Sequence, residues 1–244
     1  MNSRRIVHHL GCIMDQKTRD CDVLLIAAKS DDLLDERWTI PFTLPLLKSI
    51  LRDAGYRVFC VYESLTPLLP EKIFEILNVH KPKCVGISGT AYEKEKITKL
   101  VRAVRSYSIE LPVVIGGYCS LVPDILEITD ADVLCHGEGD KTIIELVDHF
   151  LQSNQQAFEG LAGIKGISYW EAERSQVLKT PDRPLFRDLD ALPYPDFEEI
   201  DFTSIREKDV VLPFYAQRGC YNACTFCDIF PFYSHQGIRS PSPS

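Results

Sequence analysis

Strand-like and helix-like segments alternate between residues 22 and 152, and this alternation constrains the fold more than any other feature of the sequence. Between the strand-like segments, apolar residues recur at helical spacing, and Gly55 is the expected stop of the first helix. Strands that alternate with helices predict a doubly wound parallel α/β sheet with right-handed crossovers. The five expected strands are short and largely apolar, as buried strands are, and cover residues 22–28, 57–62, 83–88, 112–116 and 132–136.

Small residues gather where three of these strands end. Ligands of doubly wound sheets bind outside the carboxyl ends of the strands, and glycine lets a backbone approach closely. A tight turn would explain any one loop, but three at the same edge favour a ligand site on a five-stranded Rossmann-like (flavodoxin-like) sheet. The third loop is not a P-loop, because Asp140, an expected helix N-cap, stands where a P-loop has glycine. The three loops are Ser88-Gly89-Thr90, Gly116-Gly117-Tyr118 and Gly137-Glu138-Gly139.

The pattern changes after residue 155. Two short strand-like segments, 166–170 and 176–180, flank a polar turn and predict a hairpin. A proline-rich stretch at 181–195 then predicts an extended linker, and residues 210–215 resume as a strand. We therefore divide the chain into an N-terminal extension (1–21), a sheet domain (22–155), a hairpin with linker (156–205) and the start of a further domain (206–244).

Three of the nine cysteines, Cys220, Cys224 and Cys227, lie within eight residues of one another. Thiolates grouped in this way most often hold zinc or an iron–sulfur cluster. Structural zinc needs four protein ligands, and the nearest candidate for the fourth is His235. Three thiolates on a four-iron cluster would leave one iron open to a further ligand. The spacing favours the cluster, and a zinc-stabilised interaction domain is the alternative.

Composition excludes two broad classes of partner. Lys plus Arg is 27 and Asp plus Glu is 35, a net charge of −8, which disfavours bulk nucleic-acid binding. The longest apolar run is the six residues 23–28, well short of the ~20 that span a bilayer. The N-terminus lacks an apolar signal segment. We therefore expect a cytoplasmic protein with reduced cysteines, whose partners are small-molecule cofactors rather than a membrane or bulk nucleic acid.

The cysteine segment matches a known signature, with three and then two residues between the cysteines and Phe226 before the last one. It resembles the motif of radical S-adenosylmethionine (SAM) enzymes. Over residues 22–240 the chain is similar to the N-terminal part of radical SAM proteins that carry an N-terminal cobalamin (B12)-binding domain. Besides the cysteines, the resemblance rests on residues 54–58, 115–118, 137–139, 192–196 and 218–220.

This resemblance implies a 4Fe-4S cluster on Cys220, Cys224 and Cys227, with SAM on its open iron and Phe226 near the adenine. The cluster would cleave SAM reductively to a 5′-deoxyadenosyl radical. The resemblance also implies a cobalamin site lined by the nine residues of the three loops. The Asp-x-His-x-x-Gly motif that supplies a cobalt ligand in some relatives is not matched, because Ile6 precedes His8 at the Asp position.

A full radical SAM barrel of six βα units would need roughly 180 residues, whereas residues 210–244 number 35. We therefore expect the first βα unit of an incomplete barrel, truncated just after the cysteine motif, and a chain that by itself lacks a complete catalytic site. The substrate and the reaction type stay open. A non-catalytic module that binds cobalamin or another ligand is the competing hypothesis.

Overall fold

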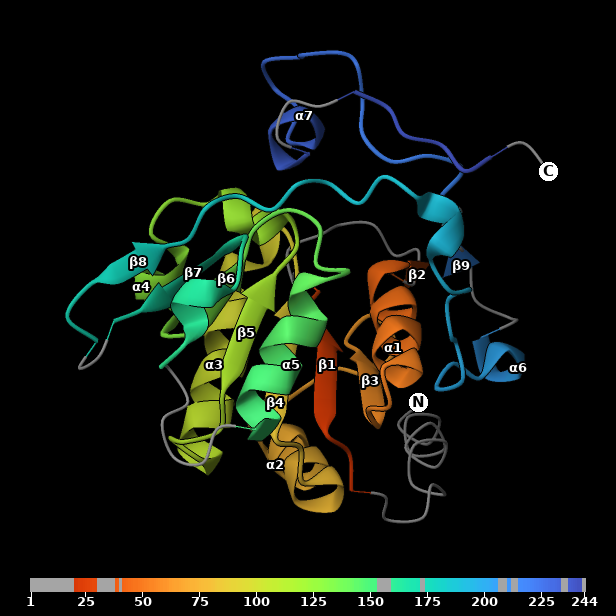
Figure 1. Ribbon diagram of the computed structural model, residues 1–244. Helices are drawn as coiled ribbons and strands as arrows, with labels where there is room; N and C mark the ends of the chain where they lie inside the picture. Colours follow the sequence, from red (N-terminus) through yellow and green to blue (C-terminus); the bar gives the residue numbers. More distant parts are fainter. Residues whose placement is uncertain are drawn as a thin grey trace.

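The computed structural model describes residues 20–29, 38–39, 41–152, 159–171, 174–205, 210–211, 215–233 and 237–242. Seven strands form one sheet in the order β3-β1-β4-β5-β6-β7-β8 (Figure 1). The first five in this order are parallel neighbours, which confirms the predicted Rossmann-like sheet. They are β1 (Val23–Ala27), β3 (Val58–Tyr62), β4 (Cys84–Ser88), β5 (Val113–Gly116) and β6 (Val133–Cys135).

The predicted hairpin is present, and it enlarges the sheet from the five strands expected to seven. Its strands are β7 (Ile167–Trp170) and β8 (Val177–Lys179). β7 pairs antiparallel with β6, and the Trp170 indole donates a hydrogen bond of 2.9 Å to the Ala131 carbonyl. The hairpin thereby covers β6, which would otherwise expose unpaired backbone groups at the sheet edge.

Helices cover both faces of the sheet, as a doubly wound fold requires. On one face lie α1 (Thr43–Asp53) and α5 (Thr142–Gln152), and Figure 1 shows α5 in front of the strands. On the other lie α2 (Pro70–His80), α3 (Lys94–Tyr107) and α4 (Ile125–Thr129).

The strands contribute side chains to two separate hydrophobic cores. In β1, for example, Leu24 and Ile26 belong to the core beneath α2 and α3, whereas Val23 and Leu25 belong to the core beneath α1 and α5. This alternation follows from the two-residue period of a strand. Both faces are therefore apolar, which explains the continuous apolar run that predicted β1.

The remaining elements are short. β2 (Trp38–Thr39) pairs in parallel with β9 (Val210–Val211), which lies within the strand predicted at 210–215; residues 212–214 lie outside the described residues, and residue 215 is not part of a strand. Two short α-helices follow the linker, α6 (Phe202–Ile205) and α7 (Ile229–Phe232). Among the described helices, none is both long and apolar enough to cross a membrane. Short 3₁₀ turns in the described part of the chain include η2 (Ala91–Glu93), η3 (Tyr118–Leu121), η4 (Leu161–Gly163) and η6 (Leu189–Ala191).

The linker lies against α1, fastened by a buried lysine. The Lys48 ammonium group lies 3.4 Å from a carboxylate oxygen of Asp196, 3.2 Å from Glu198 and 2.8 Å from Glu199. Burial opposes the charge of Lys48, but these carboxylates outweigh it and raise the pKa of the lysine. The segment that leads from the sheet toward the cysteines is thus attached to the sheet domain.

Candidate cofactor-binding site

A cavity of about 560 Å³ lies at the carboxyl ends of the parallel strands. Its position is the topological switch point of the sheet, since β1 lies between β3 and β4 and the chain crosses over in both directions from it. The structure brings together around this one cavity all nine residues predicted from the three loops: Ser88, Gly89, Thr90, Gly116, Gly117, Tyr118, Gly137, Glu138 and Gly139.

Two of the three loops are bonded to each other through their backbones. The Gly89 amide donates to the Gly116 carbonyl at 3.2 Å, and the Cys119 amide donates to the Gly89 carbonyl at 2.9 Å. Gly117 lies between these bonds with φ +87° and ψ −162°, a conformation that essentially only glycine adopts. A Cβ there would lie 2.8 Å from the Gly89 carbonyl oxygen and 2.9 Å from the Ser88 hydroxyl. The close approach of the two loops therefore depends on glycine at this position.

Thr90 shapes the first loop through its side chain. It caps η2, where its hydroxyl oxygen accepts a hydrogen bond of 3.2 Å from the Tyr92 amide. In return the buried Glu93 carboxylate accepts from the Thr90 amide at 2.6 Å and from the Thr90 hydroxyl. This reciprocal capping fixes the course of the chain as it leaves β4 and enters α3.

The walls of the cavity include residues that the sequence analysis did not single out. Leu47 of α1 and Ile143 of α5 line it, together with the buried Cys135. Burial raises the pKa of the Cys135 thiol to about 12, so it stays protonated near neutral pH and behaves as a small apolar group.

Four aromatic side chains line the cavity, Tyr118 from the loop after β5 and three from the C-terminal part of the chain, and we call Tyr118, Tyr215, Phe232 and Tyr233 the aromatic roof. The rings of Tyr118 and Phe232 lie 4.2 Å apart between centroids, and Tyr215 meets Phe42 edge to face at 4.8 Å. Figure 1 shows α7, which ends in Phe232, above the sheet. The aromatic residues at 230–233 have no periodic pattern that could have predicted this contact.

The cysteine loop comprises residues 219–238 and contains all three motif cysteines. Cys220 and Cys227 are partly buried and Cys224 is exposed, and none of the described cysteines forms a disulfide. The donor set of three thiols on one loop suits an iron–sulfur cluster. However, in the part of the chain that the structure describes, no three potential metal ligands are close enough to hold an ion. The three thiols thus share a loop without converging, and His235 lies outside the described residues.

Phe226, predicted to lie near the SAM adenine, is 89% exposed. Its ring is therefore accessible to a planar ligand. Local contacts near the cysteines include a hydrogen bond of 3.4 Å from the Asn222 amide to the Cys220 sulfur and one of 3.2 Å from the Cys227 amide to the Cys224 carbonyl.

Glu138 lines the cavity, and its carboxylate is held by neighbours from the C-terminal part of the chain. Its carboxylate accepts hydrogen bonds from Arg218, from Arg239 and from the Phe186 amide. Asp140, predicted as a helix N-cap, accepts two hydrogen bonds from Arg218, of 2.7 and 3.0 Å. Burial alone would raise the pKa of Glu138, but these hydrogen bonds and the Arg218 charge together lower it below its ordinary value.

The segment that carries the three loops matches a known family. Residues 39–147 match the family model of the B12 binding domain. The chain is 28% identical over 193 residues to an uncharacterised methyltransferase of Pyrococcus horikoshii, covering 77% of this chain and 40% of that protein. It is 26% identical over 209 residues to the anaerobic magnesium-protoporphyrin IX monomethyl ester cyclase of Rubrivivax gelatinosus, covering 82% and 37%. The chain therefore spans two fifths or less of the length of these relatives.

Two solved structures share the fold over most of the chain. One is the cobalamin-dependent SAM radical enzyme OxsB with aqua-cobalamin and SAM bound, with a TM-score of 0.72 at 20% identity, covering 91% of this chain and 30% of that one. The other is the radical SAM methyltransferase TsrM of Kitasatospora setae with cobalamin and a [4Fe-4S] cluster, with a TM-score of 0.70 at 17% identity, covering 90% and 43%. Residues 39–147 thus match the B12 binding domain model, and the chain shares its fold with solved structures of cobalamin-dependent radical SAM enzymes.

Proposed function

We propose that this chain binds cobalamin at the carboxyl edge of its sheet. The observation that carries the proposal is the cavity at the switch point, lined by three glycine-bearing loops within the segment that matches the B12-binding family. The bound cobalamin would supply cobalt chemistry, and the protein would supply binding, orientation and exclusion of water.

The residues of the cavity divide these tasks between backbone and side chains. Gly116, Gly117 and Gly139 expose their backbone to the cavity and leave room for a large, flat ligand. Leu47 and Ile143 make part of the wall apolar and exclude water. The described lining contains no histidine. Since Ile6 also breaks the cobalt-ligand motif, we propose a mode of binding in which these loops give cobalt no imidazole ligand.

A titration of the purified chain with hydroxocobalamin tests this proposal. We expect a shift of the absorption spectrum that saturates at one cobalamin per chain, and co-elution of cobalamin with the protein in gel filtration. A spectrum identical to that of free hydroxocobalamin, with no co-elution, would overturn the proposal. In that case the cavity would serve another ligand.

We propose further that Cys220, Cys224 and Cys227 bind a 4Fe-4S cluster that takes SAM, with Phe226 against the adenine. The motif spacing supports this, as does the accessible position of the loop above the cavity, where α7 contacts η3. The three thiols would converge when iron binds, because metal binding and local folding are coupled at such sites. The reductive cleavage of SAM, and the substrate on which the radical acts, belong to this proposal as expectations from the resemblance.

Replacing Cys224 with alanine is expected to reduce the iron bound after anaerobic reconstitution from about four atoms per chain to below one, because a three-thiolate site loses one of its ligands. Iron and sulfide analysis measures the change. Cys84→Ala is the matched control, since Cys84 is buried in β4 and is expected to leave the iron content unchanged. Stoichiometric zinc with no iron uptake in the unmodified chain would favour the zinc alternative instead.

The SAM part has its own measurement. Adding SAM to the reduced, reconstituted protein is expected to change its electron paramagnetic resonance spectrum, and Phe226→Ala is expected to raise the SAM concentration required. A cluster spectrum that SAM leaves unchanged would argue against the open-iron site.

A further inference from the structure

We infer that Glu138 and Asp140 are the anchor of the cysteine loop and set its position over the cavity. This assigns Glu138 a positioning role in place of the cofactor contact predicted for it. The role of this anchor in cofactor binding rests on the proposed function. The contacts that form the anchor are all made between described residues of this chain.

The cysteine loop begins and ends at one point. The Arg218 amide donates to the Arg239 carbonyl at 2.9 Å, and the Arg239 amide donates to the Arg218 carbonyl at 2.8 Å. This isolated antiparallel bridge closes the loop that contains the three motif cysteines. Whatever holds Arg218 and Arg239 therefore holds both ends of the loop.

Two carboxylates hold these two arginines. Arg239 donates a hydrogen bond to Glu138 from each of its two terminal nitrogens, and each nitrogen lies 2.9 Å from a carboxylate oxygen. Arg218 donates two hydrogen bonds to Asp140 in the same way, of 2.7 and 3.0 Å. It also donates a hydrogen bond of 3.0 Å to Glu138. Bidentate hydrogen bonds between a guanidinium and a carboxylate fix the orientation of the two groups as well as their distance, which a single ion pair does not.

The cluster is enclosed and balanced in charge. The side chains are 8% exposed for Glu138, 6% for Asp140, 15% for Arg218 and 12% for Arg239. Burial opposes the charge on Arg218, yet its pKa lies above the ordinary range because the hydrogen bonds with Asp140 outweigh the burial. Two cations meet two anions, so removing any one of the four leaves a buried charge without compensation.

The same carboxylate also joins the loop to the cavity. Glu138 belongs to the turn after β6 that lines the cavity, and it accepts a hydrogen bond of 3.0 Å from the Phe186 amide of the linker. A Cβ on the neighbouring Gly137 would lie 3.3 Å from the Phe232 carbonyl oxygen in the aromatic roof. One turn thus contacts the linker, both ends of the cysteine loop and the helix that covers the cavity. A change in this turn should move the cysteines and the cavity together.

Hydrogen exchange of the cofactor-free chain tests the anchor. In Asp140→Asn and in Arg218→Gln, we expect the amides of Arg218 and Arg239 to exchange at least tenfold faster than in the unmodified chain. The double variant should exchange no faster than Arg218→Gln alone, because Arg218→Gln already removes the contact with Asp140. Glu145→Gln is the control, since Glu145 on α5 pairs with Arg183 of the linker and not with the loop. Exchange that is unchanged in both anchor variants, or raised equally in the control, would overturn the anchor.

A second readout separates positioning from mere support of the fold. The dissociation constant for hydroxocobalamin is measured before and after the cluster is reconstituted, in the unmodified chain and in Asp140→Asn. We expect reconstitution to change it in the unmodified chain at least threefold more than in the variant, because the anchor couples the two sites. An equal effect in both would overturn the positioning role. Failure of the unmodified chain to bind cobalamin at all would count against the proposed function, while the exchange measurement would still decide the anchor.

Discussion

Replacement of Gly117 with alanine is expected to weaken hydroxocobalamin binding by at least tenfold. Gly117 has φ +87° and ψ −162°, a region that costs other residues of order 1–3 kcal/mol. Its new Cβ would also lie 2.8 Å from the Gly89 carbonyl oxygen, a backbone atom that can move only if the loop moves. Since a factor of ten corresponds to about 1.4 kcal/mol, strain of this size is enough to displace the two loops from the cavity.

The measurement is the same absorption titration, carried out on folded protein verified by circular dichroism. Gly163→Ala is the matched control, because a Cβ at Gly163 would meet nothing within 4 Å. The control is expected to bind as the unmodified chain does. If Gly117→Ala also bound cobalamin with unchanged affinity, the loops after β4 and β5 would not form the site, and the proposed position of cobalamin would be wrong.

The location of the cavity could be predicted from the sequence because it depends on local patterns. An apolar run predicts each parallel strand, and glycines directly after the strand predict each of the three loops. The rule that ligands bind at the carboxyl edge of such a sheet then connects segments that lie far apart in the chain. For this reason Ser88, Gly117 and Gly139 could be assigned to one cavity before their distances were known.

The rest depends on tertiary contacts that leave no local trace. The alternating pattern of the hairpin predicts β7 and β8. It does not predict which strand of the sheet the hairpin pairs with, because that depends on which sheet edge is left unpaired. The partners of Arg218 lie 78 and 80 residues away, and no spacing in the sequence links them. The position of Glu138 in a loop therefore predicts that it lines the cavity, but not that its carboxylate contacts two arginines. The cysteine spacing likewise predicts a set of ligands without predicting where the three side chains point.

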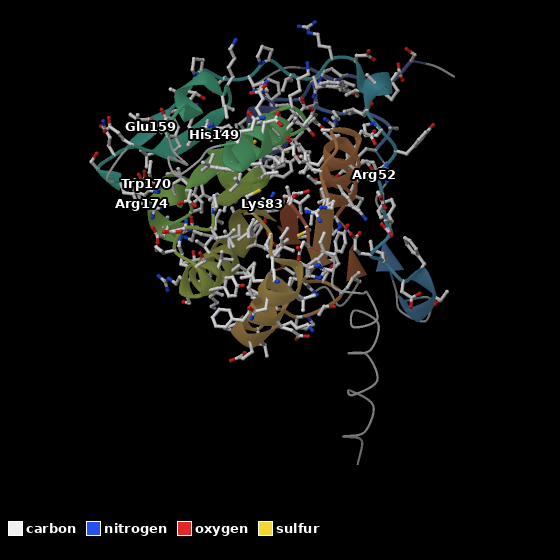
Figure 2. All side chains as sticks on the ribbon, turned by 60° about the horizontal axis from the view of Figure 1, so that its bottom comes forward. Arg52, Lys83, His149, Glu159, Trp170 and Arg174 are labelled. Atoms are coloured by element: carbon white, nitrogen blue, oxygen red, sulfur yellow. The ribbon has the colours of Figure 1, made fainter. Side chains whose placement is uncertain are left out.

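At the opposite end of the sheet, Asp132 has a structural role. Asp132 comes directly before β6, and its side chain is 4% exposed. One carboxylate oxygen lies 2.5 Å from the Arg105 guanidinium and accepts a hydrogen bond of 2.7 Å from the Val113 amide. The other accepts a hydrogen bond of 2.8 Å from Arg174, which packs over the Trp170 ring near the hairpin (Figure 2). Asp132 thus connects α3, β5 and the hairpin away from the cavity.

Asp132→Asn is expected to lower the free energy of unfolding by about 3–5 kcal/mol, because it leaves the Arg105 cation, 8% exposed, without its buried counter-charge. Urea unfolding measures this loss. Asp182→Asn is the control, since Asp182 pairs with Lys179 where both side chains are more than half exposed, and a change within about 0.5 kcal/mol is expected.

The comparison of Asp132→Asn with Gly117→Ala then separates the two ends of the sheet. At temperatures where Asp132→Asn remains folded, it is expected to bind hydroxocobalamin with the affinity of the unmodified chain, because none of its contacts lies on the cavity. Gly117→Ala is expected to lose affinity while the described core keeps its packing. If Asp132→Asn lost affinity as strongly, the site would depend on the stability of the whole sheet. The local geometry of three loops would then be too weak an explanation of binding.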